Sequence, residues 1–132
     1  MKGTGDALLK VEDLKTYFFT DEGIIKALDG VSFEIPKSQQ GSTLGVVGES
    51  GCGKSVTARS ILRILDQRGK IVSGKILFNP NGETIDLTKL DPKGKQIREL
   101  RGKDITMVFQ EPMASFSPVY TIGDQVMEAI LM

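Results

Sequence analysis

The sequence predicts an α/β fold in which an antiparallel pair of strands precedes a strand, a glycine-rich loop and a helix. Two apolar segments with partial alternation, residues 7–19 and 24–35, flank the turn-like cluster TDEG. A short valine-containing run bounded by glycine, TLGVVG (43–48), is typical of a buried strand. From Ser55 to about Leu65, apolar residues recur as they do on a helix that packs on a sheet.

The next part of the chain predicts shorter elements. SGKILFN (73–79) is typical of a strand, and IDLTKL (85–90) predicts another short strand after the turn-like PNGE. Asp91 followed by proline predicts the cap and first turn of a short helix, which Gly102 ends.

Two further elements are expected towards residue 132. DITMVFQ (104–110) is a second candidate for a buried strand. From Ile122, the spacing of apolar residues predicts an amphipathic helix.

The composition is that of an ordinary globular protein and excludes several chemistries. Hydrophobic residues make up 39% and charged residues 26% of the 132 residues. Lys+Arg and Asp+Glu both total 17, and this balance does not favour a nucleic-acid partner. One cysteine cannot form an internal disulfide, which fits the cytosol, and the absence of histidine rules out a Ser–His triad. No stretch reaches the roughly 20 apolar residues of a membrane-spanning helix.

The segment Gly48–Ser55, GESGCGKS, fits the pattern G-x-x-x-x-G-K-[ST] at every position. Glycines let the backbone curl so that N–H groups face phosphate oxygens, and the following helix adds its positive end. Lys54 would reach the β- and γ-phosphates, and the Ser55 hydroxyl would ligate Mg²⁺. The alternative is a glycine-rich turn with a surface lysine. The residues expected to bind nucleotide are Gly48, Ser50, Gly51, Cys52, Gly53, Lys54, Ser55, Val56 and Thr57.

The position of this loop in the chain distinguishes between classes of phosphate-loop protein. More than forty residues of strand-like sequence precede it, which indicates an extra antiparallel layer in front of the nucleotide core. DPKG (91–94) matches the D-x-x-G of GTPases, but no N-K-x-D follows to read guanine.

Three stretches together resemble the ATP-binding subunits of ABC transporters of the oligopeptide/dipeptide uptake type. They are LKTYFFTDEGIIKALDGVSFEI, LGVVGESGCGKSVTARSIL and RGKDITMVFQEPMASFSPVYTIGDQ. The resemblance implies the N-terminal part of a P-loop NTPase of the ABC ATPase type, with an antiparallel β subdomain and an incomplete RecA-like core. The implied divisions are the strand pair at about 7–35, the phosphate-loop core at 43–110, and the Q-loop with the start of a helical subdomain at 111–132.

The resemblance also implies roles for residues outside the loop. An aromatic on the first strand would stack on adenine; the spacing from Leu14 favours Phe18, with Tyr17 as the second choice. The alternative is that both aromatics belong to the core of the strand pair. Gln110 resembles the Q-loop glutamine, whose carbonyl oxygen reaches Mg²⁺ or the attacking water. Residues 111–120 would contact a membrane-spanning permease subunit. ATP and Mg²⁺ are the implied cofactors, a second ATP-binding subunit the other partner, and the inner face of the cell membrane the location.

The sequence departs from the family's pattern in ways that bear on catalysis. It contains no L-S-G-G-Q signature, no apolar run ending in Asp-Glu, and no histidine. We therefore expect the chain to be the N-terminal half of a longer protein that binds Mg·ATP weakly and does not turn it over alone. Three alternatives remain at this point: a non-transport ABC ATPase acting on DNA, a small-molecule kinase, and a non-catalytic interaction fragment.

Overall fold

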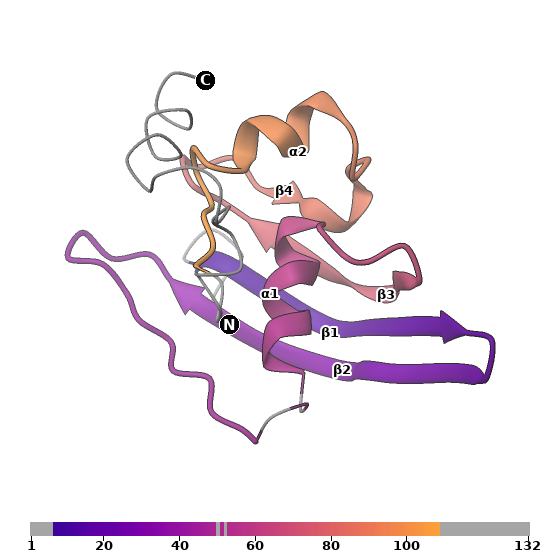
Figure 1. Cartoon of the computed structure of the whole chain (residues 1–132). Helices are drawn as coiled ribbons and strands as arrows, with labels where there is room; N and C mark the ends of the chain where they lie inside the picture. The colour runs from indigo at the N-terminus through magenta and orange to yellow at the C-terminus, as the bar shows by residue number, and fades with distance from the viewer. Residues whose placement is uncertain (1–6, 50, 52, 109–132) are drawn as a thin grey trace, which may run out of the picture.

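The structure, a computed structural model, describes residues 7–49, 51 and 53–108. Its central feature is a four-stranded sheet with the order β2-β1-β3-β4, in which every neighbouring pair is antiparallel (Figure 1). The strands are β1 (Ala7–Thr20), β2 (Gly23–Pro36), β3 (Gly69–Phe78) and β4 (Ile85–Asp86). The predicted antiparallel layer is therefore present, and it contains a third long strand, β3, beside the predicted pair.

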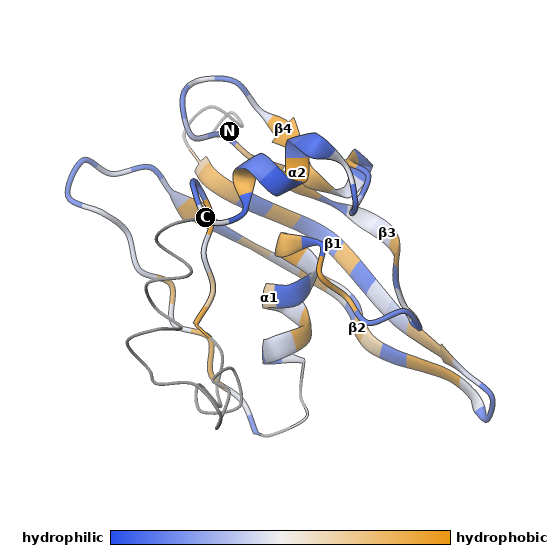
Figure 2. Cartoon of the chain, turned by 45° about the horizontal axis from the view of Figure 1, so that its top comes forward, coloured by the Kyte–Doolittle hydropathy of each residue, from blue (hydrophilic) through white to orange (hydrophobic). Residues whose placement is uncertain are grey.

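The hairpin β1–β2 confirms the predicted strand pair. Thr20 pairs with Gly23 across the turn, and the Thr20 hydroxyl donates to the Gly23 carbonyl at 2.8 Å. Hydrophobic and hydrophilic residues alternate along both strands (Figure 2), as expected where one face of a sheet is covered. The tip of the hairpin extends beyond the helix α1 (Lys54–Leu62) in Figure 1.

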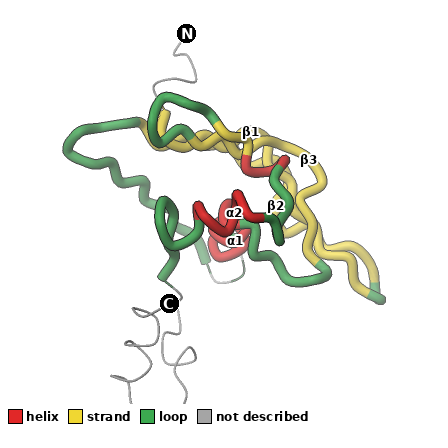
Figure 3. Tube along the Cα trace, turned by 90° about the horizontal axis from the view of Figure 1, so that it is seen from above, coloured by secondary structure: helices red, strands yellow, loops and turns green. Residues whose placement is uncertain are grey.

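Both α-helices lie on the same side of the sheet (Figure 3). They are α1 (Lys54–Leu62) and α2 (Lys95–Leu100), and a 3-10 turn, η2 (Leu87–Lys89), follows β4. The buried residues of the core are Leu9, Val11, Leu14, Leu28, Ile76, Phe78, Leu87, Ile97 and Leu100. The core thus joins the sheet to η2 and α2. No helix in the described part of the chain is long and apolar enough to cross a membrane.

The middle of β1 is irregular in both of its ladders. The register shifts between Val11 and Leu14 against β2, and between Glu12 and Lys15 against β3. Gly74 of β3 has φ +99°, and a Cβ built on it would lie 2.5 Å from the Asp13 carbonyl oxygen. The two strands approach too closely here for any side chain, so the bulge depends on glycine.

The segment 85–90 forms a shorter strand than predicted. Only Ile85 and Asp86 pair with β3, and the chain then turns into η2. The Asp86 carboxylate causes this change, because it accepts hydrogen bonds from the Thr88 amide at 3.0 Å and the Thr88 hydroxyl at 2.6 Å.

The helix predicted from Asp91 begins later than expected. Asp91 caps a turn instead: its carboxylate accepts from the Lys93 amide at 3.0 Å, and its carbonyl accepts from the Gly94 amide at 2.8 Å. Gly94 occupies the position before the first helical residue, Lys95. Gly102, with φ +83°, follows the helix as predicted.

The described residues form neither of the two predicted buried strands, and residues 109 and 110 of the second one lie outside the described part of the chain. Residues 43–48 contain no strand, and residues 104–108 contribute only an isolated bridge between Arg101 and Ile105. Apolar side chains in both segments remain open to solvent: Val46 is 57%, Val47 96% and Val108 91% exposed. Strands of this composition occur in parallel sheets that are covered on both faces, and the described residues contain no parallel ladder for these segments to join.

The role of Gly74 at the bulge can be tested by substituting it and Gly82, a glycine of similar conformation outside the bulge, with alanine. Gly74 and Gly82 have almost the same φ, +99° and +95°, but a Cβ at Gly82 meets nothing within 4 Å. Gly82→Ala should lower the free energy of unfolding by about 1–2 kcal/mol, the strain of a left-handed alanine. Gly74→Ala adds a backbone clash and should cost a further 1–3 kcal/mol or so. Urea unfolding of the two variants measures the difference, and equal losses would show that the strands do not approach at Gly74.

Candidate functional site

The glycine-rich loop enters α1 through a glycine that touches the sheet. Gly53 has φ 101° and ψ 3° and stands just before the first helical residue. A Cβ built on it would lie 2.8 Å from the Leu28 Cδ2 atom and 3.1 Å from the Ala27 carbonyl oxygen. Gly51 is also left-handed, with φ +82°, but has open space around it. The loop therefore needs glycine at residue 53 for both conformation and contact with β2.

The first turn of α1 leaves its positive end available to an anion. Gly53 provides no side-chain cap, and the turn contains no acidic residue. Thr57 closes the turn, since its amide and its hydroxyl both donate to the Gly53 carbonyl, at 2.9 and 2.8 Å. The N–H groups and the dipole at such a helix end favour phosphate oxygens.

Lys54 is folded over the loop that precedes it. Its ammonium group donates to the Gly48 carbonyl and, at 3.0 Å, to the Glu49 carbonyl. These carbonyls hold the charge at the loop, where a phosphate group would compete with them for the same donors. Ser55 is exposed, whereas Val56 and Thr57 are half-buried against the sheet. Ser50, Cys52 and Gln110 lie outside the described residues.

The two candidate aromatics on β1 have different surroundings. The Phe18 ring packs on Gly69 of β3, where an added Cβ would lie 2.9 Å from its Cε1 atom and 3.3 Å from the Leu65 Cβ atom. Phe18 therefore lies beside the start of β3 and close to Leu65, in the segment that follows α1. Its role in stacking on a base stays a prediction.

Tyr17 is held by its neighbours on β2. Its hydroxyl donates to the Asp29 carboxylate at 2.7 Å, and the Lys26 ammonium lies 5.6 Å from the ring centroid. The hydrogen bond to Asp29 raises the pKa of the Tyr17 hydroxyl, because it stabilises the protonated phenol beside a negative charge.

Sequence reasoning missed the residues that hold the far end of α1. The helix ends at Leu62, earlier than predicted, because Arg63 adopts the left-handed conformation with φ 58° and ψ 38°. Arg101 donates from Nε to the Leu62 carbonyl at 2.8 Å and from Nη2 to the Arg63 carbonyl at 2.6 Å. No local sequence pattern predicts the bond from Arg101 to Leu62, because 39 residues separate the two.

A strand-supported glycine loop that leads into a helix with lysine and serine at its first two positions defines a phosphate-loop protein. The particular family follows from comparison with known proteins. The family model described as ABC transporter matches residues 28–130, so the chain belongs to the ABC transporter family. This confirms both the predicted fold class and the resemblance.

Several named proteins are similar to this chain. A probable peptide ABC transporter ATP-binding protein, y4tR of Sinorhizobium fredii, is 48% identical over 95% of the chain, and the dipeptide transport ATP-binding protein DppD of Bacillus subtilis 43% over 96%. The glutathione import ATP-binding protein GsiA of Escherichia coli is 42% identical over 93%. The chain spans 35% of the length of the first two relatives and 19% of the third.

The Tyr17–Asp29 contact can be tested by titration. The Tyr17 hydroxyl should ionise above the ordinary value of 10.0, and Asp29→Asn should bring its pKa back towards that value. Absorbance of the phenolate against pH measures both, and Tyr17→Phe assigns the signal, since the sequence has one other tyrosine, Tyr120. An unchanged pKa in Asp29→Asn would contradict the hydrogen bond.

Proposed function

We propose that this chain is an ATP-binding part of an ABC importer for peptides. The observation that carries the proposal is the phosphate loop itself, fixed to β2 at Gly53 and leading into an uncapped helix end. The relatives' names, which specify peptide, dipeptide and glutathione, favour peptide transport over a DNA-acting ATPase or a small-molecule kinase.

Different residues of the described part of the chain would contact different parts of a nucleoside triphosphate. Backbone N–H groups from Gly51 to Ser55 would face the phosphates, and the Lys54 ammonium would exchange its loop carbonyls for phosphate oxygens. The Ser55 hydroxyl is exposed and able to ligate Mg²⁺, the ion that neutralises the phosphates when bound. Phe18, or Tyr17, would contact the base, and Gln110 would act from the segment outside the described residues.

The proposed partners follow from the same family. Membrane-spanning permease subunits would contact residues 111–120, and a second ATP-binding subunit would face the nucleotide. The chain would work at the cytoplasmic face of the membrane, held there by the permease. Hydrolysis in the complete assembly would drive import.

Nucleotide binding is tested by calorimetric titration of the full chain with Mg·ATP. Wild-type protein should bind, and Lys54→Ala should bind at least about tenfold more weakly, because a charge-assisted contact of roughly 1.5–3 kcal/mol is lost. Lys103→Ala removes the same charge from an exposed turn and should leave binding unchanged. Equal affinities of Lys54→Ala and wild type, or no binding by the wild type, would contradict the proposal for this chain.

Turnover is a separate expectation. The sequence lacks the Asp-Glu segment and the histidine that position the attacking water in this family, so the chain should release no phosphate from Mg·ATP. Phosphate release measured beside Lys54→Ala tests this. Release by the wild type that disappears in the variant would contradict the expectation while supporting the nucleotide site.

A further inference from the structure

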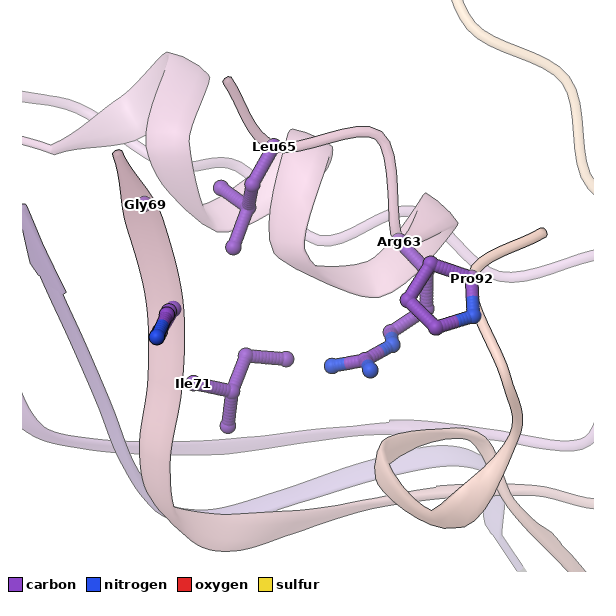
Figure 4. A pocket seen from close by; sticks show the side chains of 6 residues that line it. Arg63, Leu65, Gly69, Ile71 and Pro92 are labelled. Atoms are coloured by element: carbon purple, nitrogen blue, oxygen red, sulfur yellow. The ribbon is translucent and has the colours of Figure 1, made fainter. Parts of the chain in front are cut away.

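A cavity of about 280 Å³ lies at the C-terminal end of α1, away from the phosphate loop. Its residues come from the segment after α1, the start of β3 and the loop before α2. They are Arg63, Leu65, Gly69, Lys70, Ile71 and Pro92. In the close view, the side chains of Arg63, Leu65 and Ile71 point into one common space, with Pro92 beside the guanidinium (Figure 4).

Arg63 occupies a backbone position that disfavours a side chain. Its φ of 58° and ψ of 38° place it in the left-handed region, and its amide closes the end of α1 on the Arg59 and Ser60 carbonyls. Glycine or asparagine is the usual residue at such a helix end. Strain of this kind is common where a side chain has a binding role.

The guanidinium of Arg63 has fewer partners than its burial requires. Its Nε atom is buried without a hydrogen-bond partner, and its Nη2 atom has one long bond, 3.4 Å, to the Leu90 carbonyl. Neither ion pair found among the described residues includes Arg63. A half-buried cation in this condition favours an added anion.

Neighbouring charges act on Arg63 in both directions. Burial, followed by repulsion from Arg101, lowers the pKa of Arg63, and the carboxylates of Asp86 and Asp91 oppose the shift from a distance. Arg101 cannot be the missing partner, because it is a cation whose own donors bond the carbonyls of Leu62 and Arg63. Arg63 therefore has no counter-charge in contact with it, and neither does Lys70, the second cation of the lining, among the described residues.

We propose that this cavity binds a small carboxylate with an apolar body. The planar guanidinium of Arg63 matches a carboxylate, while Leu65, Ile71 and Pro92 supply apolar walls. Arg63 suits a monoanion better than a phosphate dianion, because the ammonium of the other lining cation, Lys70, lies over the Phe19 ring, 5.9 Å from its centroid. The site is independent of the phosphate loop, which stands at the other end of α1.

The test uses the full chain and 4-fluorobenzoate, followed by ¹⁹F NMR. The acid should bind saturably, and its neutral counterpart 4-fluorobenzamide should bind at least about tenfold more weakly. Arg63→Gly should weaken binding of the acid by a similar factor. Because glycine suits the left-handed backbone, this variant retains the fold. Arg98→Ala is the matched control, because it removes the same charge from the exposed side of α2.

Two further measurements separate the cavity from other sites. Leu65→Phe narrows the cavity while keeping Arg63, and it should also weaken binding of the acid. Lys54→Ala and saturating Mg·ATP should leave acid binding unchanged. Equal binding by wild type and Arg63→Gly, equal binding of acid and amide, no binding of the acid, or displacement by Mg·ATP would each overturn the proposal.

Discussion

The contact between Gly53 and β2 is the constraint on which the candidate site depends. The left-handed glycine turns the loop into the helix, and the Leu28 side chain and Ala27 carbonyl leave no room for a Cβ at that point. Leu28 is itself 3% exposed and belongs to the core. The position of the loop is therefore fixed by a buried residue of the hairpin, 25 residues earlier in the chain. The antiparallel layer serves as the base on which the phosphate loop rests.

The helix that follows the loop is held at three points, two of them by strands of the sheet. Its start touches Leu28 of β2, and the buried Ser60 hydroxyl in its last turn bonds Thr16 of β1 at 2.9 Å. The carbonyl of its last residue, Leu62, accepts a hydrogen bond from Arg101, which follows α2. A hydrogen bond between buried hydroxyls contributes about 1 kcal/mol, but leaving either one unpaired would cost more, so the pair mainly fixes where the helix lies. Both ends of α1, and the loop and cavity beside them, thereby keep defined positions relative to the sheet.

The loop could be predicted from sequence because its chemistry is local. Eight consecutive residues contain the glycines, the lysine and the serine, and the helix begins one residue from where apolar spacing placed it. The Gly53–Leu28 contact and the Arg101 bond could not be predicted, because they join residues distant in the chain that carry no pattern of their own. Arg63 was missed for a related reason: its conformation is set by the end of the helix, and arginine is not the residue that usually signals one.

The strands that form have partners close by in the chain or in the sheet, whereas two predicted strands have no such partner among the described residues. A two-residue turn joins β1 to β2, and β3 pairs with the other edge of β1. Residues 43–48 and 104–108 have the composition of buried parallel strands, but composition supplies only a preference, and the ladder must come from neighbours of similar direction. The described sheet is antiparallel throughout and offers them no such edge. Val47 and Val108 are consequently exposed although their neighbours in sequence are apolar, and the loop keeps its place through Gly53 and β2 instead of through a strand before it.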